Sequence, residues 1–429
     1  MPKPIVRILP PVAALATWIW LWKFVGEHTW TWGRVTFWFL LAIVALLLAV
    51  NTRAVTKWLS PPSTGRAILI AVLALASVYL CVRQARVIRD GFGPPWAERL
   101  WDVSQGAYDF NQALLVRGEN PYGTRTQPQP VHMFKGYSRE PDGREYFYGW
   151  RYYYGYTHFP MSALWFSPFI GITDSYDDIR IGNLFYFVLN LVLLNAILFI
   201  ASDRSVLACL FGTVAFLGVD FMVTETFLLG IIDQAFSAPL LAAILLAVTS
   251  RWRAAGVLAG LSLASKHFPA IPVVFALVIF VYRSGQLRLF ASFAIASFAA
   301  VMLPFVLWDY EAFVSATLLT HLHEAGRGDD TALYFFLPDA WKTPFRLFGL
   351  STIAAAYAWG YREMKQPDVR LLFLVIAVVC LLINTFYPVT HLNHLEAILA
   401  FAAISFAITT PSPTLPRCRS WQQGRGPES

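Results

Sequence analysis

A long succession of apolar runs, separated by polar connections, restricts the fold more than any other feature of the sequence. A membrane-spanning helix needs about 20 apolar residues, and somewhat shorter runs also cross. The composition agrees, because 57% of the residues are hydrophobic and 14% are charged, whereas soluble domains carry about 25% charged residues. The sequence therefore predicts an all-α polytopic membrane protein with about twelve transmembrane helices and large external loops. These spans are expected near residues 8–26, 34–50, 66–83, 181–201, 204–219, 232–249, 254–265, 268–282, 287–308, 344–361, 370–388 and 392–410.

The basic residues predict the orientation of these spans. Lys and Arg prefer the cytoplasmic side of a membrane. The apolar segment 159–173 is short, and we expect it to form a re-entrant or interfacial hairpin that stays outside. If it crossed instead, the acidic connection that follows it would be cytoplasmic. With the hairpin outside, both termini and all later basic connections lie inside, namely those with Arg204, Arg251, Arg253, Arg283, Arg288, Arg362, Lys365, Arg370 and the tail.

The longest polar interruption runs from Arg83 to Phe159, and we interpret it as the working loop. Loops of this length are usually functional or disordered, and its many aromatic residues argue against disorder. The N-terminus begins like a signal peptide, but without a convincing cleavage site it is expected to remain as the first span. The predicted regions are N-terminal spans (1–82), the external catalytic loop with its hairpin (83–180), core spans (181–308), a second external loop (309–343), C-terminal spans (344–410) and a disordered cytoplasmic tail (411–429).

Several kinds of chemistry lack their sequence signatures. The four cysteines are spread over apolar runs and the tail, which gives no disulfide or zinc pattern. The net charge of +7 is scattered in short clusters, so it indicates membrane topology and not nucleic-acid binding. There is no phosphate-binding G-x-x-x-x-G-K-[ST] loop, no G-x-G-x-x-G after a strand and no Asp-x-Asp. An enzyme of this kind would take an activated substrate from the membrane, with no cofactor and no metal.

Short motifs follow one another along residues 84–300. Asp102 opens the loop and is followed by Tyr108 and by a G-x-x-P-Y motif that ends at Tyr122. Further motifs are His158-Phe159-Pro160 at the return to the membrane, Gly230-Ile231-Ile232-Asp233-Gln234 before a span, and Lys266-x-x-Pro269 between two spans.

In order and spacing, this series resembles the GT-C glycosyltransferases, specifically the bacterial glycosyltransferase family 87 branch of polyprenyl-phosphate-sugar-dependent enzymes. Two positions depart from the family pattern: His158 stands where the family has Tyr, and Ile231 stands where it often has Gln. The hairpin of spans before the loop is also an addition to the usual single first span.

The resemblance implies an integral membrane hexosyltransferase of the cell envelope. It would move a sugar, mannose by analogy, from a polyprenyl phosphate donor to an extracytoplasmic glycolipid or glycan acceptor, with inversion. The protein would be multi-pass in the plasma (inner) membrane, with its active site outside. Its partners would be the donor, the acceptor and the lipid bilayer, and no nucleic acid.

Two carboxylates are the catalytic candidates. A sugar on a lipid phosphate already has a good leaving group, so one general base on the acceptor hydroxyl suffices. By its place in the family pattern, Asp102 is that base; a plain solvated carboxylate is the alternative. Asp109 lies seven residues later and shares a face with Asp102 if the segment is helical. It is the reserve candidate and would orient the acceptor.

The departing phosphate needs cations at the outer membrane edge. Lys266 sits where two spans meet, which is costly unless it is paired or wetted, and we expect it to face the phosphate with His267 as a helper. Snorkelling towards head groups is the alternative for Lys266. In the second external loop, Arg327 would be a second phosphate contact, and His321 belongs to an amphipathic helix with possible substrate contact.

The remaining binding candidates are Trp101, beside Asp102, and the motif residues Tyr122, His158, Asp233 and Gln234, which the resemblance implicates in substrate contact. The aromatic run from Tyr146 to Tyr156 is expected to be mainly an interfacial belt, with one or two rings stacking on sugar. A secondary transporter or flippase is the alternative function, although it predicts repeated halves and ionisable residues near span centres. A scaffold without chemistry gives no reason for so long a polar loop.

Overall fold

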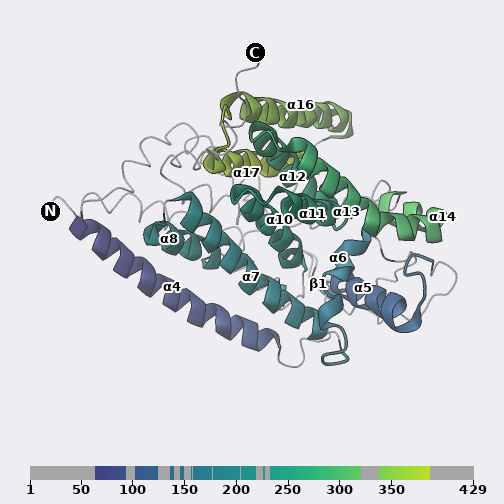
Figure 1. Cartoon of the computed structure of the whole chain (residues 1–429). Coiled ribbons are helices and arrows are strands. Elements are labelled where there is room, and N and C mark those ends of the chain that lie inside the picture. Colours follow the sequence, from purple (N-terminus) through teal and green to yellow (C-terminus); the bar gives the residue numbers. More distant parts are fainter. Residues whose placement is uncertain are drawn as a thin grey trace, which may run out of the picture.

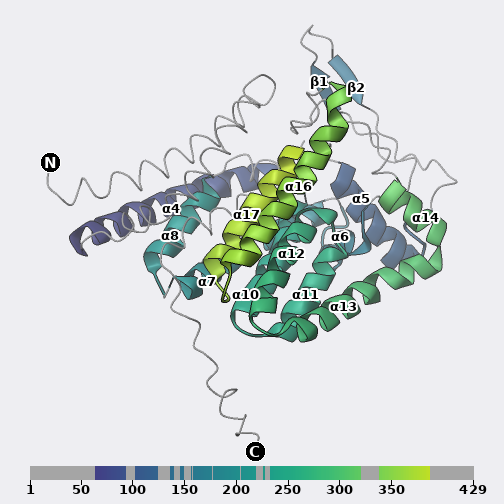
Figure 2. The same cartoon turned by 90° about the horizontal axis from the view of Figure 1, so that it is seen from above.

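The computed structural model describes residues 63–92, 102–123, 136–139, 145–148, 156, 158–175, 177–202, 204–218, 226–227, 232–319 and 338–386. Within these ranges the chain is helical, apart from turns and one antiparallel pair of short strands, β1 (Gly136–Arg139) and β2 (Glu145–Tyr148) (Figure 2). The expected spans at 8–26, 34–50 and 392–410 lie outside the described residues.

Nine described helices coincide with nine expected spans to within a few residues at most ends (Figure 1). They are α4 (Ser63–Gly91), α7 (Asp177–Ala201), α8 (Val206–Leu217), α10 (Asp233–Val248), α11 (Trp252–Leu263), α12 (His267–Arg283), α13 (Leu287–Trp308), α16 (Asp339–Glu363) and α17 (Val369–Phe386). The agreement follows from the apolar runs, because each run satisfies its own backbone hydrogen bonds as a helix.

Helix α4 extends eight residues beyond the expected end of its span, so the first part of the working loop is helical. Arg83, Arg86 and Arg89 are exposed on this extension. On another face, the buried Gln84 donates through Nε2 to the carbonyl oxygen of Leu217, at 2.7 Å. Charged residues on one face and packed residues on another let the helix continue past its apolar run.

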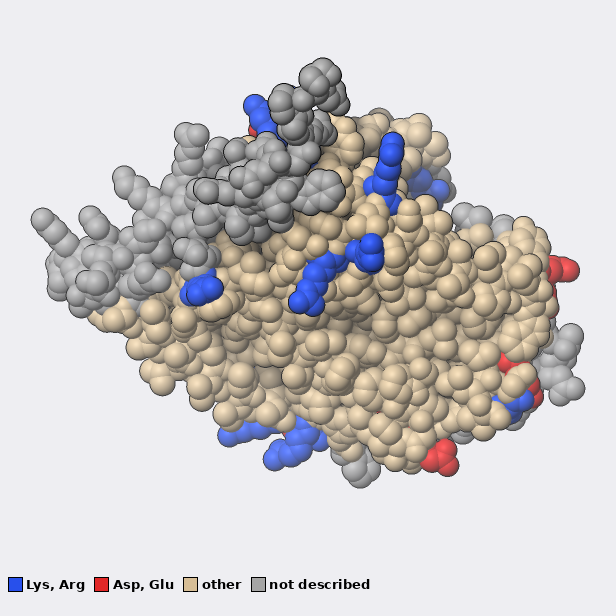
Figure 3. All heavy atoms as spheres, viewed as in Figure 1, with Lys and Arg blue, Asp and Glu red and all other residues tan. Residues whose placement is uncertain are grey.

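Three helices are long and apolar enough to cross a membrane by length and composition: Ala67–Gly91, Asp177–Ala201 and Leu287–Trp308. Each exposes large apolar side chains, among them Leu75, Val192 and Leu307. The face shown in Figure 3 is largely uncharged apart from a few Lys and Arg side chains, and most of the acidic atoms visible there lie towards the end where α5 and α14 are found. The protein is therefore a membrane protein, and a total of twelve spans stays a prediction.

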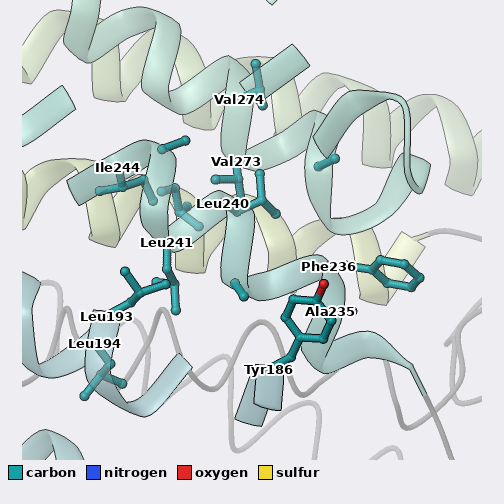
Figure 4. Close-up of a cluster of buried hydrophobic side chains, with 14 of the residues drawn as sticks. Tyr186, Leu193, Leu194, Ala235, Phe236, Leu240, Leu241, Ile244, Val273 and Val274 are labelled. Carbon is teal, nitrogen blue, oxygen red and sulfur yellow. The ribbon is translucent and has the colours of Figure 1, made fainter. Parts of the chain in front are cut away.

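The core is centred on α10, which packs against α7, α11 and α12. Leu193 and Leu194 of α7 and Val273 of α12 belong to the same buried cluster as Leu240 and Leu241 of α10 (Figure 4). Helix α11 packs most extensively against α13, and α16 packs against α17.

The segment after Phe159 forms only α6 (Pro160–Leu164) and a short 3-10 turn, Ser167–Phe169. The buried carboxylate of Asp178 accepts hydrogen bonds from the backbone N–H groups of Gly171 and Thr173, which ties the following turn to the start of α7. The segment is thus not one spanning helix, and its re-entrant or interfacial position stays a prediction.

Two of the basic connections between helices lie next to each other. Arg283, at the end of α12, donates through Nη2 to the carbonyl oxygen of Tyr361, and its guanidinium carbon lies 4.1 Å from the centroid of that ring. Because Tyr361 lies near the end of α16, two of the basic connections lie side by side at one end of the bundle.

Candidate active site

A buried ion pair joins the beginnings of two core helices. Lys266 immediately precedes α12 and Asp233 is the first residue of α10. The Lys266 Nζ lies 2.9 Å from Asp233 Oδ1, and the two side chains are 11% and 5% exposed. An intramembrane lysine is tolerated when it is paired, and Asp233 provides that partner.

The surroundings of Lys266 leave hydrogen-bonding capacity on its ammonium. An ammonium carries three N–H donors. Among the described residues, Asp233 is the one hydrogen-bond acceptor for it, and the Phe236 ring centroid lies 5.3 Å from Nζ. Within the described ranges, no acceptor takes the other two N–H groups, which could bind the oxygen atoms of water or of an anion.

Asn190 fixes the start of α10 from the middle of α7. Its buried side chain donates through Nδ2 to the backbone oxygen of Gln234 at 2.9 Å and to its side-chain Oε1 at 2.8 Å. The first turn of α10, with Asp233, is thus held against α7 independently of Lys266.

The start of α12 is held by α6 and by the residues before it. The Met161 N–H donates to the carbonyl oxygen of Ala264 at 3.0 Å. The Trp165 indole donates to Ser265 Oγ at 2.8 Å, and the Phe159 and His267 rings lie 4.5 Å apart between centroids. The segment from Phe159 to Trp165 is therefore packed directly against the residues around Lys266.

The helix α5 (Asp102–Asn111) carries both candidate carboxylates. Asp102 begins the helix and Asp109 is half-buried near its end, so the helical condition for a shared face is met. The side chain of Asp102 lies outside the described part of the structure. The buried Asn111 donates through Nδ2 to the Ala107 and Ala163 carbonyl oxygens, both at 2.8 Å, and so ties α5 to α6.

An aromatic cluster connects the G-x-x-P-Y turn with the ends of α13 and α14 (Tyr310–Val314). Tyr122 packs edge-on against Phe110, Phe305 and Phe313, with ring centroids 5.1–5.7 Å apart. Its hydroxyl donates to the carbonyl oxygen of His158 at 2.7 Å. Burial raises the pKa of Tyr122 well above its ordinary value, so the side chain stays neutral and acts as a structural donor.

Six of the expected site residues lie along one connected path. Tyr122 contacts His158, the next residue Phe159 packs on His267, and Lys266 pairs with Asp233 beside Gln234. Helix α5, which begins at Asp102 and contains Asp109, is tied to α6 by Asn111. Trp101, His321 and Arg327 lie outside the described residues.

The hydrogen bonds of Asn111, Asn190 and Trp165, and the ion pair of Asp233 with Lys266, were not predicted from the sequence. One signal for that pairing was present, because both residues were expected at outer helix ends and carry opposite charges. Among the described residues, no three His, Cys, Asp or Glu side chains form a group that could hold a metal ion.

The sequence matches Glycosyltransferase family 87 over residues 156–411, more than half of the chain. The chain belongs to glycosyltransferase family 87. No curated protein matches it. The match includes His158, Asp233, Lys266 and His267, whereas Asp102 precedes it. A family 87 glycosyltransferase with apolar helices implies a sugar donor, an acceptor and a membrane, and nothing in the described residues favours the transporter alternative.

Proposed function

We propose that this family 87 protein is an inverting glycosyltransferase. It moves a sugar, mannose by analogy with the GT-C enzymes it resembles, from a polyprenyl phosphate to a glycolipid or glycan on the outer side of the plasma membrane. The protein spans the membrane about twelve times with both termini cytoplasmic.

The observation that carries this proposal is the buried ammonium of Lys266. It is 11% exposed, and among the described residues it has one hydrogen-bond acceptor. A cation with unused donors, beside the chain segment that re-enters the bundle, suits an anionic oxygen ligand such as a lipid phosphate.

The reaction is a single displacement at the anomeric carbon. The carboxylate of Asp102 takes the proton of an acceptor hydroxyl while that oxygen bonds to the anomeric carbon. The bond from the anomeric carbon to the phosphate oxygen breaks, and its electron pair leaves with the polyprenyl phosphate. Lys266 stabilises that charge, His267 and Arg327 assist, and Asp109 orients the acceptor.

Transfer from labelled polyprenyl-phosphate mannose to a crude acceptor mixture tests the proposal. The native chain should transfer the label, and Asp102→Asn should lower kcat about 10²-fold or more, because the general base is lost. Lys266→Met should lower kcat by about 10² as well, because the leaving phosphate loses a charged donor.

Two control variants accompany this experiment. Lys365→Met removes an exposed lysine from the connection between α16 and α17 and should leave transfer unchanged. The double variant Lys266→Met with Asp233→Asn removes both buried charges, so it should fold without transferring. Equal transfer by the native chain and Asp102→Asn would exclude Asp102 as the base. Donor binding without transfer by the native chain would favour the transporter.

A further inference from the structure

We propose that Asp233 is a positioning residue for this reaction. Its carboxylate holds the Lys266 ammonium at the place where the lipid phosphate of the donor binds, and it acts through Lys266 without touching the sugar. This inference rests on the proposed role of Lys266.

The Lys266 side chain requires such a restraint. A lysine ammonium sits on a flexible four-carbon stem, and near a helix end it tends to reach towards water. Here the ammonium is held inside the bundle, 2.9 Å from Asp233 Oδ1 and 5.3 Å from the Phe236 ring centroid. Both contacts come from the first turn of α10.

The backbone that carries the Asp233 carboxylate is held by contacts that do not involve Lys266. Asn190 of α7 donates to both oxygen atoms of Gln234, the next residue. Ser237 Oγ donates to the backbone oxygen of Asp233 at 3.3 Å, one turn further along α10. The position of Asp233 at the start of α10 therefore does not depend on its pairing with Lys266.

Asp233 also lowers the free energy of burying the Lys266 ammonium before the donor binds. A single buried charge is costly in a bundle, and an opposite charge at hydrogen-bond distance compensates for it. The pair uses one of the three N–H groups of Lys266, and no other acceptor in the described part of the chain takes the remaining two, which would bind phosphate oxygens.

A purely structural ion pair is the competing explanation. Such a pair would join α10 to α12, and its loss would lower the amount of folded protein without changing how folded molecules bind donor. The Michaelis constant for the donor distinguishes the two explanations, because it does not depend on the concentration of active protein.

The experiment measures kcat, donor KM and acceptor KM for Asp233→Asn, with polyprenyl-phosphate mannose as the donor. We expect donor KM to rise at least tenfold and acceptor KM to stay constant. Asp233→Glu, which retains the charge one methylene further out, should raise donor KM less. Asp178→Asn is the matched control, because its buried carboxylate binds backbone N–H groups in a turn; it should lower the folded fraction and leave donor KM unchanged.

An unchanged donor KM in folded Asp233→Asn, with transfer intact in the native chain, would overturn this inference and leave the proposed function standing. If Asp233→Asn does not fold, Asp233→Glu decides: a raised donor KM supports positioning and an unchanged one overturns it. Absence of transfer by the native chain would overturn the proposed function and, with it, this inference.

Discussion

Buried amide side chains connect several of the helices. Asn111 ties α5 to α6, Asn190 ties α7 to α10, and Gln84 ties α4 to the end of α8. In each case the side chain donates to a backbone carbonyl on another segment. Buried polar groups are stabilising when they are bonded and costly when they are not, so these residues set the relative positions of the segments.

Asn111→Ala tests whether the hydrogen bond to Ala163 sets the position of α5. The change removes the donor to Ala163 and should lower the free energy of unfolding by about 1–3 kcal/mol. It should also lower transfer per folded molecule, because α5 carries Asp102 and Asp109. Thermal unfolding in detergent and the transfer assay provide the two measurements.

Asn195→Ala is the matched control for that variant. Asn195 donates to the Leu191 carbonyl and to Thr213 Oγ1 between α7 and α8, away from α5. It should lose comparable stability and keep transfer per folded molecule. Equal transfer by folded Asn111→Ala and Asn195→Ala would show that the α5–α6 tie has no part in the reaction.

Helices α11 and α13 pack closely against each other. Gly256 and Gly260 lie one turn apart on α11, and a Cβ added at Gly260 would overlap the carbonyl oxygen of Ala294 and the hydroxyl of Ser297. A Cβ at Gly256 would overlap the carbonyl oxygen of Phe290. Small residues four apart are the usual device for close approach of helices in membranes.

Gly260→Ala should therefore separate α11 from α13. We expect a loss of about 1–3 kcal/mol in the free energy of unfolding, since the added methyl group meets backbone that cannot turn away. Ala254→Leu, on the exposed face of the same helix, adds more volume and should be close to neutral. A Gly260→Ala protein with the native unfolding temperature would contradict this packing.

The helices themselves were predictable from sequence, whereas their contacts were not. Apolar runs alone place nine described helices, because a membrane leaves few alternatives to the helix. The extension of α4 to Gly91 was missed, since length was counted on apolar residues only. Lys266 was expected to need a partner, but a partner 33 residues away depends on how α10 and α12 converge, which one sequence does not reveal.

In the whole molecule, the helix ends that carry the described candidate residues gather at one end of the bundle. Helices α5, α6 and α14 lie together in Figure 1; α6 and α14 pack against α13, and α5 packs against α7. Basic connections such as the one after Arg283 lie at helix ends that carry none of the expected site residues. The candidate residues and the basic connections thus lie at opposite helix ends, which supports an orientation with the candidate site outside.

Labelling of single cysteines tests that orientation. In a chain whose four native cysteines are replaced, Ile172→Cys should react with a membrane-impermeant maleimide added outside, and Arg251→Cys should react only after the membrane is opened. Both positions are exposed. Reaction of Ile172→Cys only from the cytoplasm would reverse the orientation and exclude an external site.

The core helices differ greatly in length. Helices α10 and α11 have 16 and 12 residues, about 24 and 18 Å at 1.5 Å per residue, whereas the hydrocarbon core of a bilayer is about 30 Å thick. Helices α4 and α7, with 29 and 25 residues, exceed that thickness. The bilayer must thin, or water must enter, where the short helices begin. The acyl chain length of the host lipids therefore sets how far the Lys266–Asp233 pair lies beneath the head groups.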